Sequence, residues 1–115
     1  MKKQPNKLAV LWTAADRDTA QKMVFMYSFN AKKNGWFDEV KLIIWGPTAK
    51  LISEDKELQD YLAEMIKVGV EVIACKACAD MYGVSDKLTQ LGANVFLVGE
   101  EFTQILKTDW KLLSV

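Results

Sequence analysis

Residues 70–84 read VEVIACKACADMYGV, and most of the fold prediction follows from this stretch because a strand pattern meets a helical pattern at a cysteine. Residues 70–74 are almost continuously apolar, which is typical of a strand covered on both faces in a parallel sheet. Cys75 ends that run and Cys78 follows one helical turn later; the chain has no other cysteine. Backbone N–H groups and the helix dipole stabilise a thiolate at the beginning of a helix, so this position favours sulfur chemistry.

Four other apolar segments alternate with helical patterns along the chain. The predicted strands are residues 8–12, 40–45, 70–74, 95–98 and 110–113. The predicted helices are residues 18–34, a helix opened by residues 53–55 and ending at Gly69, a short helix after the cysteines, and residues 85–91 and 100–107. This alternation predicts repeated βα units and therefore an α/β fold with a mostly parallel five-stranded sheet.

The helix over residues 18–34 has more apolar surface than one stripe requires. Asp18 is the expected N-terminal cap, and Gly35 suits a helix C-terminus. The residues expected to face the sheet are Ala20, Met23, Val24, Tyr27 and Ala31. Phe25, Met26 and Phe29 widen this surface, and an exposed apolar patch usually marks a contact surface. We therefore expect a homo-oligomer.

Composition excludes several classes of partner. The chain has 115 residues, half of them apolar, which suits one domain over residues 1–115 with a continuous core. The 15 basic and 15 acidic residues cancel, and Arg17 is the only arginine, so the clustered positive charge of a nucleic-acid surface is lacking. The apolar run at residues 8–12 is too short for a signal peptide or a membrane span. We expect a cytoplasmic protein that binds neither nucleic acid nor membrane.

The sequence lacks the residues that several common kinds of catalytic or binding site require. The sequence has no histidine and no third cysteine, so neither a zinc site of four Cys or His ligands nor a triad with a histidine base can form within the chain. It also lacks the glycine-rich motifs that bind dinucleotides or nucleoside triphosphates tightly. A disulfide between Cys75 and Cys78 would close too short a loop to stabilise the fold much. We expect no metal and no organic cofactor, and sulfur transfer or redox chemistry remains.

Ligands of open parallel sheets bind beyond the carboxyl ends of the strands, near the point where strand order reverses. The residues at these ends are Thr13 and Asp16, Gly46 and Pro47, Cys75 and Cys78, and Gly99 and Glu100. Thr13 and Gly46 are therefore candidate substrate-binding residues, and Lys76 is a third because a nearby positive charge stabilises a thiolate. A purely structural interpretation remains open for each, since cysteines pack as small apolar residues, glycines form turns and most lysines are solvated.

The stretch of residues 70–84, with Gly83 eight residues after Cys75, and the later run of residues 92–95 resemble the DsrE-like (DsrE/DsrF-like) family of small sulfur-relay proteins. The resemblance spans nearly the whole chain. It implies a three-layer α/β/α fold of the flavodoxin-like type, association as trimers or hexamers, and a persulfide carried on Cys75. It also adds Gly83 to the candidate substrate-binding residues.

The resulting hypothesis is a sulfur carrier. Cys75 would accept sulfane sulfur from a donor and pass it to the thiol of a partner protein, and Cys78 could release the sulfur by forming an internal disulfide. Two alternatives remain open at this stage. One is a non-enzymatic module that binds a small ligand or a protein, with both cysteines merely packed; the other is a disulfide reductase that uses both thiols.

Overall fold

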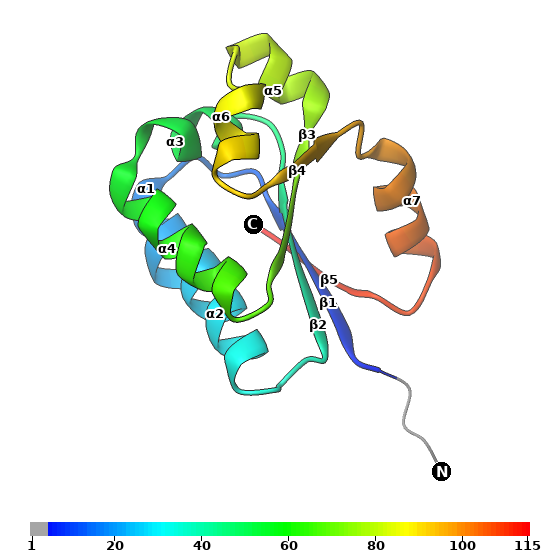
Figure 1. The fold of residues 1–115 in the computed structure, drawn as a ribbon. Coiled ribbons are helices and arrows are strands. Elements are labelled where there is room, and N and C mark those ends of the chain that lie inside the picture. The colour runs from blue at the N-terminus through cyan, green and yellow to red at the C-terminus, as the bar shows by residue number, and fades with distance from the viewer. Residues whose placement is uncertain (1–4) are drawn as a thin grey trace.

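The computed structural model describes residues 5–115, and within that range the chain forms one five-stranded parallel sheet (Figure 1). The strands are β1 (Lys7–Trp12), β2 (Glu39–Ile44), β3 (Glu71–Cys75), β4 (Asn94–Phe96) and β5 (Lys111–Ser114). Their order across the sheet is β4-β3-β2-β1-β5, and every neighbouring pair is parallel. The predicted α/β class and parallel sheet are confirmed, and each predicted strand boundary lies within two residues of the observed one.

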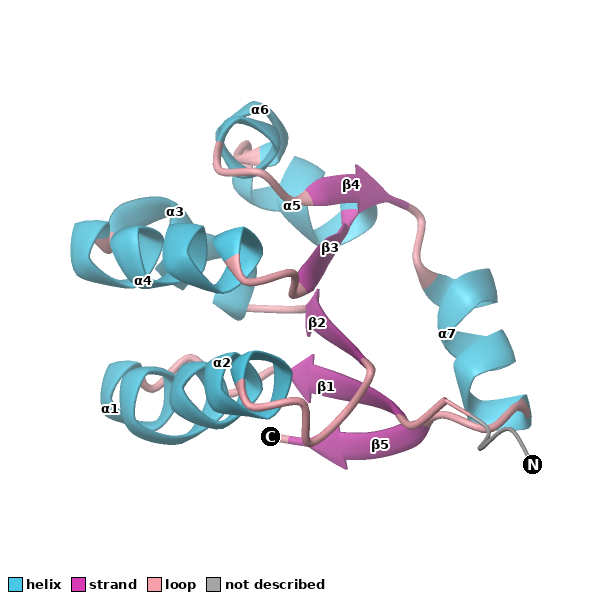
Figure 2. Ribbon diagram, turned by 60° about the horizontal axis from the view of Figure 1, so that its bottom comes forward, coloured by secondary structure: helices cyan, strands magenta, loops and turns pink. Residues whose placement is uncertain are grey.

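The helices cover the two faces of this sheet unequally. They are α1 (Arg17–Thr19), the π-helical segment η1 (Ala20–Phe25), α2 (Met26–Lys33), α3 (Thr48–Glu54), α4 (Lys56–Lys67), α5 (Lys76–Tyr82), α6 (Ser85–Gln90) and α7 (Gly99–Lys107). In the described part of the chain, α7 is the one helix wholly on the second face, α1 to α4 and α6 lie on the first face, and α5 lies beyond the carboxyl end of β3 (Figure 1 and Figure 2). The three layers are therefore a helical layer, the sheet, and a single helix.

Apolar side chains pack on both faces of the sheet. Trp12 and Phe25 pack edge to face on the side of α1 to α4, with ring centroids 4.9 Å apart. On the opposite side a smaller group, which we call the α7-face cluster, consists of Ala9, Ile43, Ile73, Cys75, Val98 and Ile105, with Leu11, Trp45, Cys78, Phe96, Phe102 and Trp110 packed against it. The alternation of side chains along β3 sends Ile73 and Cys75 to this second face.

The helix predicted over residues 18–34 differs from the observed one in which side chains it buries. Ala20, Val24 and Ala31 are buried as expected, but Met23 and Tyr27 are exposed, whereas Phe25 is fully buried. The cause is η1, because its wider turn of i to i+5 hydrogen bonds rotates the following side chains about the axis relative to an α-helix. The predicted contact surface therefore loses Phe25.

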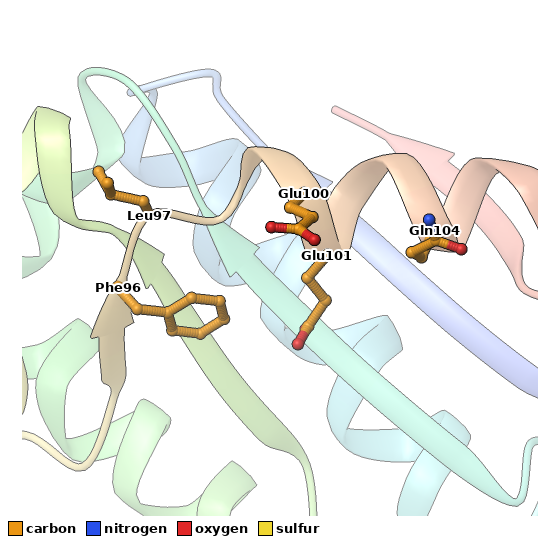
Figure 3. Close-up of a pocket in the computed structure, with 5 residues that line it drawn as sticks. All are labelled: Phe96, Leu97, Glu100, Glu101 and Gln104. Carbon is orange, nitrogen blue, oxygen red and sulfur yellow. The ribbon is translucent and has the colours of Figure 1, made fainter.

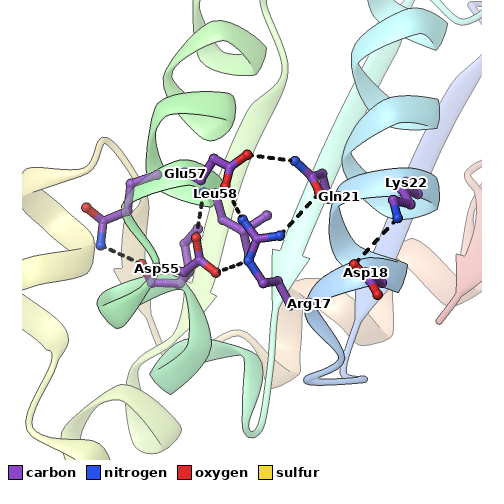
Figure 4. Close-up of polar contacts among 9 residues, drawn as sticks. Arg17, Asp18, Gln21, Lys22, Asp55, Glu57 and Leu58 are labelled. Carbon is purple, nitrogen blue, oxygen red and sulfur yellow. Dashed lines mark hydrogen bonds and ion pairs between the residues drawn. The ribbon is translucent and has the colours of Figure 1, made fainter.

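The second long helix begins later than predicted. Residues 53–54 end α3, a helix that the sequence analysis did not identify, and Asp55 has extended backbone between α3 and α4. The Asp55 carboxylate caps α4 by accepting a hydrogen bond of 3.0 Å from the Leu58 N–H. Arg17 donates to the same carboxylate at 2.7 Å and so ties the start of α1 to the start of α4 (Figure 4).

No helix among residues 5–115 combines the length and the apolarity needed to cross a membrane.

Candidate functional site

Cys75 is the last residue of β3 and lies at the carboxyl edge of the sheet, immediately before α5. Its backbone is extended (φ −68°, ψ 114°), and the following residue begins the helix. The apolar strand and the helix start thus place it where the sequence predicts. Its side chain, however, belongs to the α7-face cluster and is only 6% exposed.

Cys78 lies one turn into α5 and packs against the same cluster, but it is more exposed than Cys75. Both side chains are free thiols. Burial raises the pKa of the Cys78 thiol above its ordinary value, and the neighbouring Cys75 thiol acts in the same direction. The backbone of Gly46 acts in the opposite direction by stabilising the thiolate. The fold therefore brings Cys75, Cys78 and Gly46 together.

Lys76, the first residue of α5, is paired with a carboxylate. Its ammonium group lies 2.6 Å from the Asp80 carboxylate, one turn along the same helix. Asp80 also accepts a hydrogen bond of 2.5 Å from the Ser85 hydroxyl. Lys76 and then Ser85 lower the pKa of Asp80, so the aspartate is ionised at neutral pH. The ammonium group of Lys76 is therefore paired with Asp80 at the surface of α5.

The two candidate glycines both have backbone roles at turns. Gly46 follows β2 with φ +72°, and Gly83 ends α5 with φ +70°, a left-handed conformation that glycine adopts without strain. Gly83 also lines a cavity of about 250 Å³ together with Asp80, Ser85 and Asp86.

Thr13 lies apart from the cysteines. Its N–H donates to the Val115 carbonyl at 2.7 Å, so it joins the ends of β1 and β5. Strand order reverses at this pair of strands, because β2, β3 and β4 all lie on the other side of β1. Since β2 separates β1 from β3, the end of β1 is roughly 10 Å from the end of β3 at the usual strand spacing. Thr13 is therefore not part of the cysteine site.

A cavity of about 400 Å³ lies between the end of β4 and α7 (Figure 3). Its walls are Phe96, Leu97, Glu100, Glu101 and Gln104. Of these, Glu100 was a predicted strand-end residue, and Phe96 and Leu97 lie in the fourth predicted strand. Phe96 is the register neighbour of Cys75 across the sheet. Neither cysteine lines this cavity or the cavities of about 340 and 250 Å³ described for residues 5–115.

A buried lysine stands next to this cavity. Lys41 on β2 has a side chain only 9% exposed, and its ammonium group lies 2.8 Å from Glu101 and 3.6 Å from Glu71. The same group sits 4.8 Å from the ring centroid of Trp110. These contacts compensate the burial of the charge and fasten α7 to the sheet. Among residues 5–115, no group of three or more Cys, Asp or Glu side chains is arranged to hold a metal ion.

Comparison with known families gives a match over residues 6–115 to the DsrE/DsrF-like family. The chain belongs to the DsrE/DsrF-like family. This confirms the resemblance noted in the sequence, and it covers every strand and helix described above. Comparison with curated proteins finds no match.

Two solved structures share the DsrE-like fold. One is BT1422 of Bacteroides thetaiotaomicron, described as a conserved protein of unknown function; it is 36% identical to this chain with a TM-score of 0.93, and the alignment covers 96% of this chain and 95% of that one. The other is the ychN protein of E. coli, 17% identical with a TM-score of 0.70, where the alignment covers 96% and 99% of the two chains. The second likeness supports the fold alone.

Proposed function

We propose that this protein is a sulfur carrier in which Cys75 holds sulfane sulfur as a persulfide and passes it to a thiol of a partner protein. The observation that carries this proposal is the place of Cys75, at the β3 to α5 junction on the carboxyl edge of the sheet, in a member of a family associated with sulfur relay. In α/β sheets, this edge is where ligands bind.

Each step is an exchange between sulfur atoms. The Cys75 thiolate attacks the outer sulfur of a donor persulfide, a new S–S bond forms on Cys75, and the donor's S–S bond breaks to release its thiolate. Delivery reverses these events when an acceptor thiolate attacks the outer sulfur on Cys75. The oxidation level of the sulfur is conserved, so neither an oxidant nor a reductant is consumed.

The surroundings of Cys75 suit storage. Ala9, Ile43 and Val98 belong to the same cluster and exclude water from the sulfur. An apolar, water-poor site protects a reactive group from side reactions with solvent. The ammonium group of Lys76, the next residue along the chain, is paired with Asp80.

The same burial supports a second candidate function. A cysteine that is 6% exposed among apolar side chains is also what a purely structural residue looks like. In that case the protein would be a binding module with packed cysteines, and Cys75 would react slowly or not at all with sulfur donors.

Site-resolved mass spectrometry separates these functions. Trypsin cuts after Lys67, Lys76 and Lys87, so Cys75 and Cys78 fall in different peptides, residues 68–76 and residues 77–87. The reduced protein is incubated with glutathione persulfide, quenched with an alkylating agent in denaturant, and digested. We expect one additional sulfur atom on residues 68–76 in the wild type, and its loss in Cys75→Ser. An unmodified wild type, or sulfur found at rest only on residues 77–87, would contradict storage on Cys75.

A further inference from the structure

We propose that Cys78 is the port of this carrier: sulfur enters and leaves the protein through Cys78 and is exchanged with Cys75 inside the chain. This inference rests on the proposed carrier function: it keeps storage on Cys75 but replaces the direct exchange of Cys75 with donor and acceptor by exchange through Cys78.

The first observation is that the two thiols occupy adjacent positions on one apolar surface. Cys75 holds the position before the first turn of α5 and Cys78 is the third residue of that helix. Side chains three positions apart at a helix start lie on the same side, about 5–6 Å between Cβ atoms. Both pack on the α7-face cluster, and the Cys75 thiol is close enough to raise the pKa of the Cys78 thiol. Transfer between them therefore needs no large movement of the backbone.

The second observation is the difference in their access to solvent. Cys75 is 6% exposed, whereas Cys78 is only partly buried. Thiol exchange requires the attacking sulfur to approach the sulfur under attack in line with the bond that breaks, so its rate depends on access. A partner protein that presents a thiol is large, so the more exposed Cys78 should be the easier of the two cysteines to reach.

The third observation concerns the charge state of Cys78. Burial is the largest effect and raises the pKa of its thiol, and the backbone of Gly46, at the turn after β2, opposes this by stabilising the thiolate. Gly46 has φ +72°, and no neighbouring atom lies within 4 Å of the position that a Cβ would take.

The exchange balances in atoms and electrons. The Cys78 thiolate attacks the outer sulfur of the donor persulfide, and the donor thiolate leaves. The Cys75 thiolate then attacks the outer sulfur on Cys78; the S–S bond on Cys78 breaks, the S–S bond on Cys75 forms, and Cys78 recovers its thiolate. Delivery to an acceptor runs in the opposite order.

This route differs from release through an internal disulfide. In that alternative, Cys78 attacks the inner sulfur of the Cys75 persulfide, so a Cys75–Cys78 disulfide forms and hydrosulfide is expelled. The sulfane sulfur would then be lost as hydrosulfide, and the protein would need an external reductant before its next cycle. The relay conserves the sulfur and needs no reductant.

The test is a time course of loading with glutathione persulfide, quenched and digested as above. In the wild type we expect sulfur on residues 77–87 first and on residues 68–76 afterwards. Cys78→Ser and Cys78→Ala should both load residues 68–76 roughly tenfold more slowly, or slower still, because the donor must reach the less accessible thiol. Met81→Ala is the matched control, since this side chain lies on α5 and is 83% exposed, and it should load at the wild-type rate.

The outcomes separate the relay from the carrier. If both Cys78 variants load residues 68–76 at the wild-type rate, the relay is wrong and the carrier stands. If the wild type accumulates the Cys75–Cys78 disulfide and hydrosulfide in step with loading, the relay is also wrong. If no peptide of the wild type gains sulfur, the carrier itself fails. Far-UV circular dichroism of both variants confirms that a slower rate reflects chemistry and not misfolding.

Discussion

At the scale of single residues, Cys75 combines a position that favours reaction with surroundings that limit access. Cys75 ends a parallel strand, so its backbone lies at the carboxyl edge of the sheet. The alternation of side chains along the strand places its side chain in the α7-face cluster. Cys78 occupies the neighbouring position with greater exposure. The chemistry proposed here follows from that division: a protected thiol stores sulfur and an accessible thiol exchanges it.

Gly83 provides a prediction at the same scale. Its φ of +70° lies in the left-handed region, and no atom stands within 4 Å of the position a Cβ would take. Gly83→Ala should therefore lower the free energy of unfolding by about 1 kcal/mol through backbone strain alone. Urea unfolding measures the change. Gly99→Ala is the control, because Gly99 also has open space around it but no positive φ; an equal loss in both variants would show that backbone conformation is not the cause.

At the scale of elements, the link between α1 and α4 depends on one carboxylate. Asp55 caps α4 through the Leu58 N–H and pairs with Arg17, which also reaches Glu57 at 2.5 Å (Figure 4). The Leu58 hydrogen bond is the largest contribution that lowers the pKa of Asp55, and Arg17 adds to it. These contacts join helices that are distant in the sequence on one face of the sheet.

Asp55→Ala should therefore lower the free energy of unfolding by about 1–2 kcal/mol, the usual effect of removing a cap. Because the pKa of Asp55 is lower in the folded state than its ordinary value of 3.8, its contribution is complete above that value and is lost as the pH falls through the folded-state pKa. The difference in the free energy of unfolding between wild type and Asp55→Ala, measured with urea, should therefore become smaller in acid. Asp55→Asn keeps the cap and loses the ion pair, so its free energy of unfolding should lie between those of the wild type and Asp55→Ala. A difference between wild type and Asp55→Ala that does not depend on pH would contradict this assignment.

Elements also differ in how far the sequence predicted them. The first four strands were predictable because continuous or nearly continuous apolar runs are typical of strands buried on both faces. The fifth, β5, has a less continuous apolar run and is mostly exposed. The π-helical turn of η1 was not predictable, because local residue types do not show an i to i+5 hydrogen-bond pattern; the burial of Phe25 against Trp12 and Tyr61 exists only in the packed structure. Helix α3 was missed because Gly46 and Pro47 are typical turn residues.

At the scale of the whole molecule, exposed apolar side chains gather on the outer surface of η1 and α2 and on the turn that follows α2. Four large side chains on that outer surface are exposed and line a cavity of about 340 Å³ with Lys22 and Asn30. They are Met23, Met26, Tyr27 and Trp36. They replace the surface of Phe25, Met26 and Phe29 that the sequence suggested, although Met26 belongs to both.

The homo-oligomer expected from the family resemblance remains a prediction. Light scattering at micromolar concentration should give a mass above that of the 13.0 kDa chain. Met26→Glu should shift the distribution toward monomer if this surface forms the contact, because it would bury a charge without a partner. A monomeric wild type would remove the expectation, and an unchanged assembly in Met26→Glu would place the contact elsewhere on the molecule.

The α/β class, the strands and the place of both cysteines after the third strand could be read from the chain's residues, because hydrophobic periodicity and helix caps are local signals. Packing established that Cys75 is buried while Cys78 is partly exposed, that Lys76 pairs with Asp80, and that Thr13 lies two strands away from the thiols. Strand order and side-chain burial are properties of contacts between segments distant in the chain, and no local pattern of residues contains them.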